Sequence, residues 1–335
     1  MAARVGVMEF GIFHEFLSIK SASQAAAFAE SFAQIAAAEE WGLDVLWLAE
    51  IHMNPQRSLL SAPLTVASAI AARTSRIKIG TAVQILPLGH PLRLAEETAT
   101  IDQISNGRLI FGVGRSAFPR AYQAYGISYQ ESTERFAESL DIIKKAWTEP
   151  VCSHRGRYYE FDNFTLVPRP VQTPHPPIRI AASQDETYGA IGAAGYPLFS
   201  AVRASPLGDL PRHGKDYREG WASGGHPGRG EMYLQVPIYV GETREAALRD
   251  AEEGMMQFSR YRPDLVRGPM NYEQVCREKG IVGTPDMVAE RIAELRETAG
   301  IDGVSAEINP GSHLSHEQVL RSLRLYCQEV MPRFK

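Results

Sequence analysis

The chain of 335 residues has few cysteines and no long apolar run. Its three cysteines, Cys152, Cys276 and Cys327, lie far apart in the sequence. Such a sparse, odd set argues against a disulfide framework or a zinc site and is typical of a reducing compartment. No apolar stretch approaches the roughly 18 residues of a membrane-spanning helix. The first residues make a poor signal peptide, because Glu9 interrupts their apolar run. We therefore expect a cytoplasmic protein that does not enter a membrane.

The chain also lacks a large excess of charge. It has 35 basic and 39 acidic residues, a net charge of −4, so nothing in it suggests a nucleic-acid surface. No histidine cluster or paired-carboxylate motif supports a metal site or a glycosidase. A Gly-x-Gly-x-x-Gly motif is missing after the first predicted strand, which lowers the case for a nicotinamide-binding Rossmann domain.

What the chain does contain is a regular alternation of apolar runs and helical patterns. The predicted strands are 5–13, 44–49, 76–83, 109–113, 178–182, 198–202, 232–240 and 304–308. The predicted helices are 24–40, 63–73, 91–104, 133–147, 186–194, 244–261, one that starts at Thr284, and 316–330. The proline-rich stretch 150–177 predicts an excursion with a hairpin, and 205–230 predicts partly irregular structure. About eight strand–helix units without a dividing linker predict one domain, 1–335, with a (β/α)8 TIM barrel fold and insertions.

Arg115 is the most informative single residue. It ends the turn Gly112-Val113-Gly114-Arg115, which follows the apolar run 109–113. An arginine there would lie at the carboxyl end of a strand, where such folds bind ligands. Its guanidinium offers a planar fork of donors to phosphate oxygens. Without this context, a salt-bridged surface arginine would be the better interpretation.

Several phrases of the chain, all in the same order, resemble the bacterial luciferase-like flavin monooxygenases. They are EEWGLDVLWLAEIH (39–52), IKIGTAVQILPLGHPLRLAEE (77–97), DQISNGRLIFGVGR (102–115), PHPPIRIAASQDET (174–187) and VMPRFK (330–335). The resemblance implies a TIM barrel that binds FMN, or a deazaflavin in a sister branch, at the carboxyl ends of its strands. It also implies reduced FMN supplied by a separate flavin reductase, and a homodimer packed through the early helices.

The resemblance assigns cofactor roles to residues at two strand ends and at the start of one helix. Arg115 matches the arginine that contacts the flavin phosphate, and Thr133 falls where luciferase has a second phosphate-binding arginine. Ala82-Val83 matches the non-prolyl cis peptide that lies beside the flavin ring in this family. Gly114 occupies the position of luciferase's reactive cysteine, and a glycine there lets the backbone approach the flavin closely.

Ser183, Gln184 and Thr187 form a further candidate phosphate site. They follow the predicted strand 178–182 and open a helix, whose free N–H groups favour an anion. Ordinary capping of that helix is the alternative, and both roles are compatible.

Glu50-Ile51-His52 departs from the family pattern. Luciferase carries Glu-His-His, and its first histidine is the catalytic one; here that position is Ile51, which cannot move a proton. This makes His52 and Glu50 the catalytic candidates and puts light emission in doubt. Alternatively, His52 is a hydrogen-bonded histidine at a strand end, and Glu50 holds a neighbouring loop.

The expected substrate pocket contains Phe10, Ile51 and Tyr122, with Phe13 and Trp47 as further aromatic candidates, although aromatics at such positions are more often core residues.

Together these observations favour a two-component flavin-dependent monooxygenase that uses reduced FMN and dioxygen to oxygenate a small organic substrate. The alternatives are a deazaflavin-dependent dehydrogenase on the same barrel and a non-catalytic flavin-binding subunit.

Overall fold

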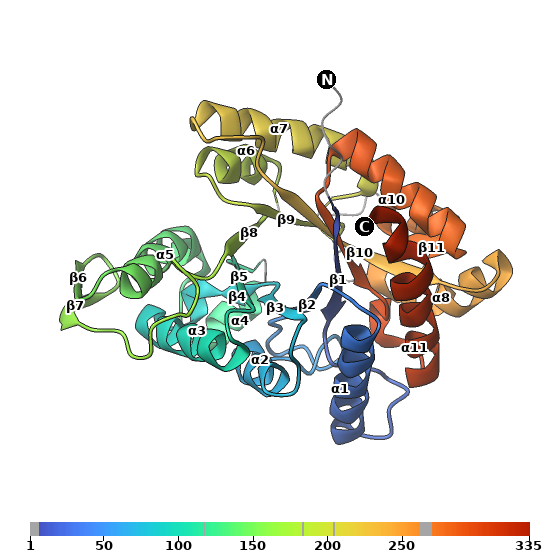
Figure 1. Ribbon diagram of the computed structural model, residues 1–335, viewed down its shortest axis with the longest axis horizontal. Helices are drawn as coiled ribbons and strands as arrows, with labels where there is room; N and C mark the ends of the chain where they lie inside the picture. Colours follow the sequence, from blue (N-terminus) through green and yellow to red (C-terminus); the bar gives the residue numbers. More distant parts are fainter. Residues whose placement is uncertain (1–6, 117, 183, 204, 261–269) are drawn as a thin grey trace.

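The computed structural model describes residues 7–116, 118–182, 184–203, 205–260 and 270–335. Within them, eight parallel strands form a closed barrel, which confirms the predicted TIM barrel (Figure 1). Each strand pairs with the next, and the last pairs with the first. In order around the barrel they are β1 (Glu9–His14), β2 (Val45–Leu48), β3 (Lys78–Thr81), β5 (Leu109–Gly114), β8 (Ile178–Ala182), β9 (Leu198–Ala201), β10 (Met232–Val240) and β12 (Gly303–Glu307).

Helices surround the barrel, as Figure 1 shows. They are α1 (Gln24–Glu40), α2 (Pro63–Ala71), α3 (Pro91–Ser105), α5 (Ser132–Thr148), α6 (Asp185–Ala193), α7 (Leu210–Ser223), α8 (Arg244–Ser259), α10 (Pro285–Ala299) and α11 (His316–Leu325). The predicted N-cap Thr284 is confirmed, because its hydroxyl accepts from the Met287 N–H. No helix of the described residues is long and apolar enough to span a membrane.

The interruptions of the alternation are of two kinds. The stretch 150–177 holds the antiparallel hairpin of β6 (Cys152–Arg155) and β7 (Glu160–Phe164), as predicted. The stretch 205–230 contains α7 and is irregular from 224 to 230, so the expectation of partly irregular structure is confirmed, although α7 itself was not predicted. The regular packing of α7 against α6 outweighs the poor helix propensity of its glycines. Shorter elements are β4 (Gln84–Ile85), α4 (Pro119–Ala124), α9 (Tyr272–Lys279) and β11 (Ile281–Gly283).

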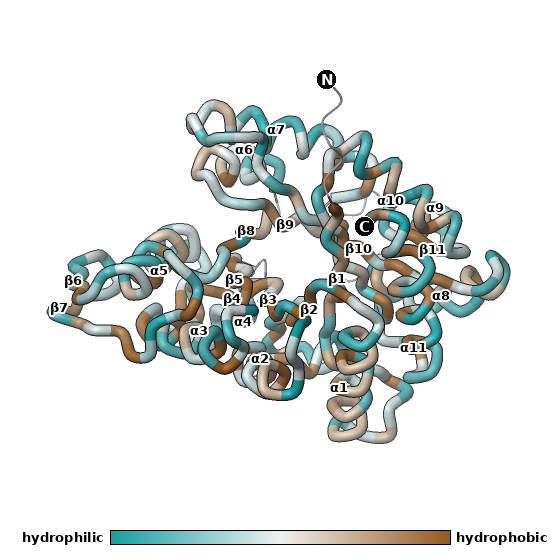
Figure 2. Tube along the Cα trace, in the orientation of Figure 1, coloured by the Kyte–Doolittle hydropathy of each residue, from teal (hydrophilic) through white to brown (hydrophobic). Residues whose placement is uncertain are grey.

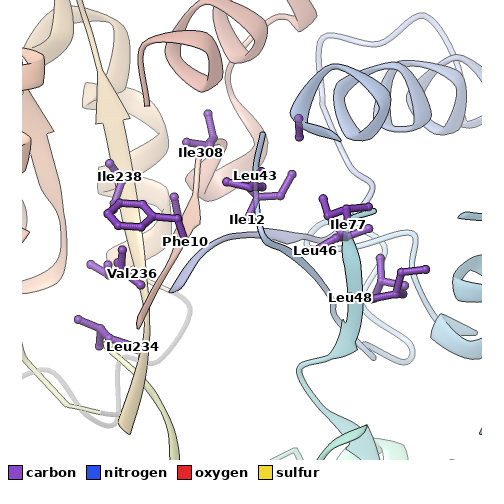
Figure 3. Packing of buried hydrophobic residues seen from close by; sticks show 14 of the residues in the cluster. Phe10, Ile12, Leu43, Leu46, Leu48, Ile77, Leu234, Val236, Ile238 and Ile308 are labelled. Atoms are coloured by element: carbon purple, nitrogen blue, oxygen red, sulfur yellow. The ribbon is translucent and has the colours of Figure 1, made fainter. Parts of the chain in front are cut away.

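Alternation along each strand sorts side chains between the barrel interior and the surrounding helices. Figure 3 shows outward residues of this kind, including Phe10, Leu46 and Leu234, in the layer between strands and helices. A second, smaller apolar cluster consists of residues that alternate with them and point inward: Phe13, Val45, Trp47, Ala49, Ile110, Phe199 and Tyr233. Figure 2 shows the apolar stretches concentrated on the strands, with mixed hydropathy on the outer helices.

An ion pair closes the amino-terminal end of the barrel. Arg179 donates to both carboxylate oxygens of Glu9, at 2.6 and 3.0 Å. Its guanidinium carbon also lies 3.4 Å from the centre of the Tyr233 ring and 5.0 Å from that of Trp47. Such bidentate pairing and ring stacking are typical of a buried arginine. The Arg179–Glu9 ion pair and the two rings thus fill this end of the barrel, and the carboxyl ends of the strands form the open face.

Candidate active site

A cavity of about 450 Å³ lies at the carboxyl ends of β2 and β5. One wall is the segment that follows β2, and the other is the segment that follows β5. Its lining residues are Glu50, Ile51, His52, Met53, Asn54, Pro55, Gln56, Arg57, Ile85, Ser116, Phe118, Arg120 and Ala121. The cavity is therefore at the end of the barrel where this fold binds ligands. Three predicted site residues, Glu50, Ile51 and His52, line it.

Glu50 and His52 form a buried pair. The Glu50 Oε1 lies 2.7 Å from the His52 Nε2, and the side chains are only 6% and 7% exposed. The other carboxylate oxygen of Glu50 accepts from the Ile85 N–H at 2.6 Å. Burial raises the pKa of Glu50, and its hydrogen bonds to His52 and Ile85 oppose that shift. Glu50 thus does hold a neighbouring segment, and it also contacts His52 inside the cavity.

Tyr125, which the sequence analysis did not single out, contacts the other nitrogen of His52. Its hydroxyl lies 3.3 Å from the His52 Nδ1, and the two rings meet edge to face with centroids 5.2 Å apart. Tyr125 follows α4, 73 positions after His52. Nothing local in the sequence signals a contact over that separation.

The peptide bond between Ala82 and Val83 is cis, which confirms that prediction. β4 then pairs with β5, so that Ile85 lies opposite Gly114. A Cβ atom on Gly114 would come within 2.6 Å of the Val83 Cγ2. Glycine is therefore required at position 114 for the backbone of β5 to lie this close to the segment after β3.

Arg115 points to the start of α5. Its Nη1 donates to the Thr133 Oγ1 at 2.8 Å and to the Ser132 Oγ at 3.3 Å. Thr133 is exposed, and its hydroxyl keeps its proton for donation to another group, whereas Ser132 is buried. A guanidinium, the Thr133 hydroxyl and a helix amino terminus form a donor set that suits a phosphate. Thr133, which falls where luciferase has its second phosphate-binding arginine, thus lies beside Arg115, which matches the first.

Gln184 and Thr187 cap α6 in the described part of the chain. They form a capping box in which the Thr187 hydroxyl contacts the Gln184 backbone nitrogen at 3.4 Å and donates to its carbonyl at 2.6 Å. This confirms the capping interpretation. A phosphate contact by this pair remains a prediction, and Ser183 lies outside the described residues.

Two residues expected in the substrate pocket lie elsewhere. Phe10 is fully buried on the outer face of β1, with its ring 5.5 Å from that of Tyr326 and 5.4 Å from that of Phe334. The prediction failed because the pleat turns Phe13, not Phe10, toward the interior. Tyr122 is fully buried too, and its hydroxyl donates to the Arg115 carbonyl. It supports the Arg115 backbone rather than lining the cavity.

A buried charged cluster at the same end of the barrel also escaped the sequence analysis. Arg57 donates to Glu15 at 3.0 Å, and Arg203 donates to Glu307 at 2.5 Å. Gln235 donates to the second oxygen of Glu307 at 2.6 Å. Burial raises the pKa of Glu307, and the Arg203 charge opposes that shift. The cluster adds buried polar groups to an end of the barrel that also holds the apolar residues Phe13, Trp47, Ile51 and Ala82.

Comparison with known proteins agrees with this arrangement. The oxygenase component of a flavin-dependent trigonelline monooxygenase from Acinetobacter baylyi is 28% identical over 327 residues, which cover 89% of this chain and 87% of that protein. The uncharacterized protein y4vJ of Sinorhizobium fredii is 35% identical over 177 residues, about half of each chain (53% and 50%). The crystal structure of monooxygenase RslO1 from Streptomyces bottropensis superposes with a TM-score of 0.89 at 27% identity, covering 98% of this chain and all of that one. The family model for luciferase-like monooxygenases matches residues 8–303, and the chain belongs to that family.

Proposed function

We propose that this protein is the oxygenase of a two-component system, which uses reduced FMN and dioxygen to oxygenate a small organic substrate. In that reaction one oxygen atom enters the substrate, the other leaves as water, and the reduced flavin supplies two electrons. The observation that carries the proposal is the joint arrangement at one end of the barrel. At that end lie the hydrogen-bond donors of Arg115 and Thr133, the close contact of Val83 with Gly114, and a cavity lined by polar and apolar residues. The chain also belongs to this family.

The residues present fit FMN. Arg115 and Thr133 would hold its phosphate, because both present donors at the start of α5, where Ser132 helps to orient Arg115. Ala82, Val83 and Gly114 would lie beside the ring system, at the carboxyl ends of β3 and β5 where Val83 packs on Gly114. Ser183, Gln184 and Thr187 are proposed as additional phosphate contacts.

The chain's own residues would then supply shielding and a proton site. Ile51 lines the cavity and packs on the interior apolar cluster, so it excludes water near the reacting centre. Glu50 and His52 are hydrogen-bonded at the cavity wall, and this pair is the group that would exchange a proton with a bound substrate. Because isoleucine replaces the first histidine of luciferase, we expect no useful light with long-chain aldehydes.

The deazaflavin alternative is less well supported by the cavity. That cofactor has a long anionic tail, which calls for several basic residues around the site. Among the described residues that line the cavity, Arg57 and Arg120 are the basic ones apart from His52, and Arg57 already pairs with Glu15. The non-catalytic alternative is disfavoured by the intact Glu50–His52 pair.

Two partners belong to the proposal: a flavin reductase and a second copy of this chain. The early helix α2 carries the small residue Ala69 on its partly exposed side, and Ala72 follows at its C-cap, which allows close packing of a second subunit. We expect a homodimer, and light scattering at micromolar protein checks this. A monomer at those concentrations would contradict the dimer but not the chemistry.

The function is tested by cofactor choice and turnover. Purified protein would be mixed with an unrelated flavin reductase, NADH and FMN, and offered small ketones, amines and phenols under air. A parallel anaerobic reaction would contain oxidised deazaflavin in place of FMN, with small alcohols as hydride donors. We expect product only with FMN and oxygen. Product formed with a deazaflavin and without oxygen would replace this proposal with the dehydrogenase.

A further inference from the structure

We propose that Tyr125 is a positioning residue for His52, and that it connects the buried Glu50–His52 pair to solvent. In this arrangement a proton reaches or leaves the cavity wall through the Tyr125 hydroxyl. The inference rests on the proposed function for its catalytic meaning. Its structural content, a chain of three side chains, is independent of that function.

The three side chains form a continuous hydrogen-bonded chain that runs from the protein interior outward. Glu50 lies 2.7 Å from the His52 Nε2, and the Tyr125 hydroxyl lies 3.3 Å from the His52 Nδ1. Glu50 and His52 are almost fully buried, whereas Tyr125 is 46% exposed. The edge-to-face contact of the two rings fixes the orientation of the imidazole. Tyr125 is thus the outer end of the chain.

The hydrogen bonds among Glu50, His52 and Tyr125 determine which nitrogen of His52 carries the proton. A neutral imidazole has one donor and one acceptor nitrogen, and an ionised carboxylate only accepts. With Glu50 ionised, the Nε2 therefore carries the proton and donates to Glu50. The Nδ1 is then an acceptor, and the Tyr125 O–H donates to it. Without Tyr125, Glu50 would still bind the Nε2, but the Nδ1 would have no side-chain partner among these three residues.

The three hydrogen-bonded side chains can take up one more proton while the same pairs of atoms stay in contact. A hydronium ion of the solvent gives a proton to the Tyr125 oxygen and leaves as water, and the proton that Tyr125 held moves to the His52 Nδ1. The proton on the His52 Nε2 then moves to Glu50. The result is a protonated Glu50, which donates to the Nε2, and an Nδ1–H that donates to the Tyr125 oxygen. Burial favours this protonated form of Glu50, because it raises the pKa of the carboxyl.

Other charged groups face this chain. Arg57 and Arg120 line the cavity, and Arg57 is paired with Glu15. Their guanidinium groups remain charged near neutral pH and do not exchange protons there. Tyr122 lies near enough to Glu50 for their charges to interact, but burial raises its pKa, so it stays neutral. On this wall, the proton path thus runs from Glu50 through His52 to Tyr125.

The test is Tyr125→Phe, which keeps the ring and removes the hydroxyl. Tyr129→Phe is a matched control, because Tyr129 is also partly exposed and packs on Tyr122 without a recorded contact to His52. Flavin-free protein labelled with ¹⁵N-histidine would be studied by NMR. In Tyr125→Phe we expect the Nδ1 signal of His52 to move toward that of a free imine nitrogen, and exchange of the Nε2 proton with solvent to slow about tenfold. Tyr129→Phe should match wild type.

Kinetics give the second readout. Tyr125→Phe should lower kcat about tenfold and change its pH profile, with KM and the FMN dissociation constant within about twofold of wild type. That loss is smaller than the 10²- to 10⁴-fold range of a direct general acid or base. Circular dichroism confirms that the variant folds. If its His52 signals and exchange rate equal those of wild type, the inference is wrong. If they change as expected and no oxygenation is found in any variant, the proposed function fails instead.

Discussion

Replacement of Arg115 by alanine is the sharpest perturbation of the cofactor site. It removes the guanidinium that the Ser132 and Thr133 hydroxyls orient at the start of α5. A hydrogen bond to a charged group contributes about 1.5–3 kcal/mol, so the variant should bind FMN roughly 10- to 100-fold more weakly. The backbone should stay in place, because Tyr122 donates to the Arg115 carbonyl and not to its side chain.

Riboflavin separates the phosphate contact from the rest of the site. It has the same ring system as FMN and no phosphate, so its binding should change by less than about threefold in Arg115→Ala. Arg115→Lys keeps the charge but loses the planar fork, and we expect a value between wild type and alanine. The assay is an anaerobic titration of reduced and oxidised flavins, followed by flavin fluorescence. Equal losses for FMN and riboflavin would refute the assignment of Arg115 to phosphate.

Three further predictions concern the cavity wall and its backbone. His52→Ala should lower oxygenation by about 10²- to 10⁴-fold and leave FMN binding within about twofold, as product analysis and titration would show; equal loss of both would make His52 structural. Gly114→Ala places a methyl group 2.6 Å from the Val83 Cγ2, so it should destabilise the protein by about 1–3 kcal/mol in urea unfolding. Unchanged stability would contradict the close approach. Because burial raises the pKa of Glu50, the folded state binds this proton more tightly than the unfolded state. The free energy of unfolding should therefore fall as the pH rises from the ordinary glutamate pKa through the raised one, and Glu50→Gln should flatten that slope.

The barrel could be predicted from the sequence because it depends on repeated local patterns. Strand runs and helical periodicity alternate at nearly every unit, and the pattern at 109–115 correctly put Arg115 at a strand end. The helix α7 was missed since its glycines and histidine lower the local helix signal, while contacts with α6 stabilise it. Local sequence does not carry that information.

The site was predictable only in part, for a different reason. The exact register of a strand decides which side chains point inward, so a choice between Phe10 and Phe13 needs the start of β1 to within one residue. The Arg57, Arg203 and Glu307 cluster joins three segments far apart in the chain. The contact of Tyr125 with His52 is of the same kind. Contacts between residues this far apart in the sequence form only when the barrel closes, so the spacing of residues does not predict them.

The most direct test of the central claim is incorporation of labelled oxygen. The protein, a separate flavin reductase, NADH and FMN would be incubated with a turned-over substrate under ¹⁸O₂, and the product analysed by mass spectrometry. We expect one ¹⁸O atom in each product molecule and none when the label is supplied as H₂¹⁸O. Turnover without label from dioxygen would contradict the monooxygenase function.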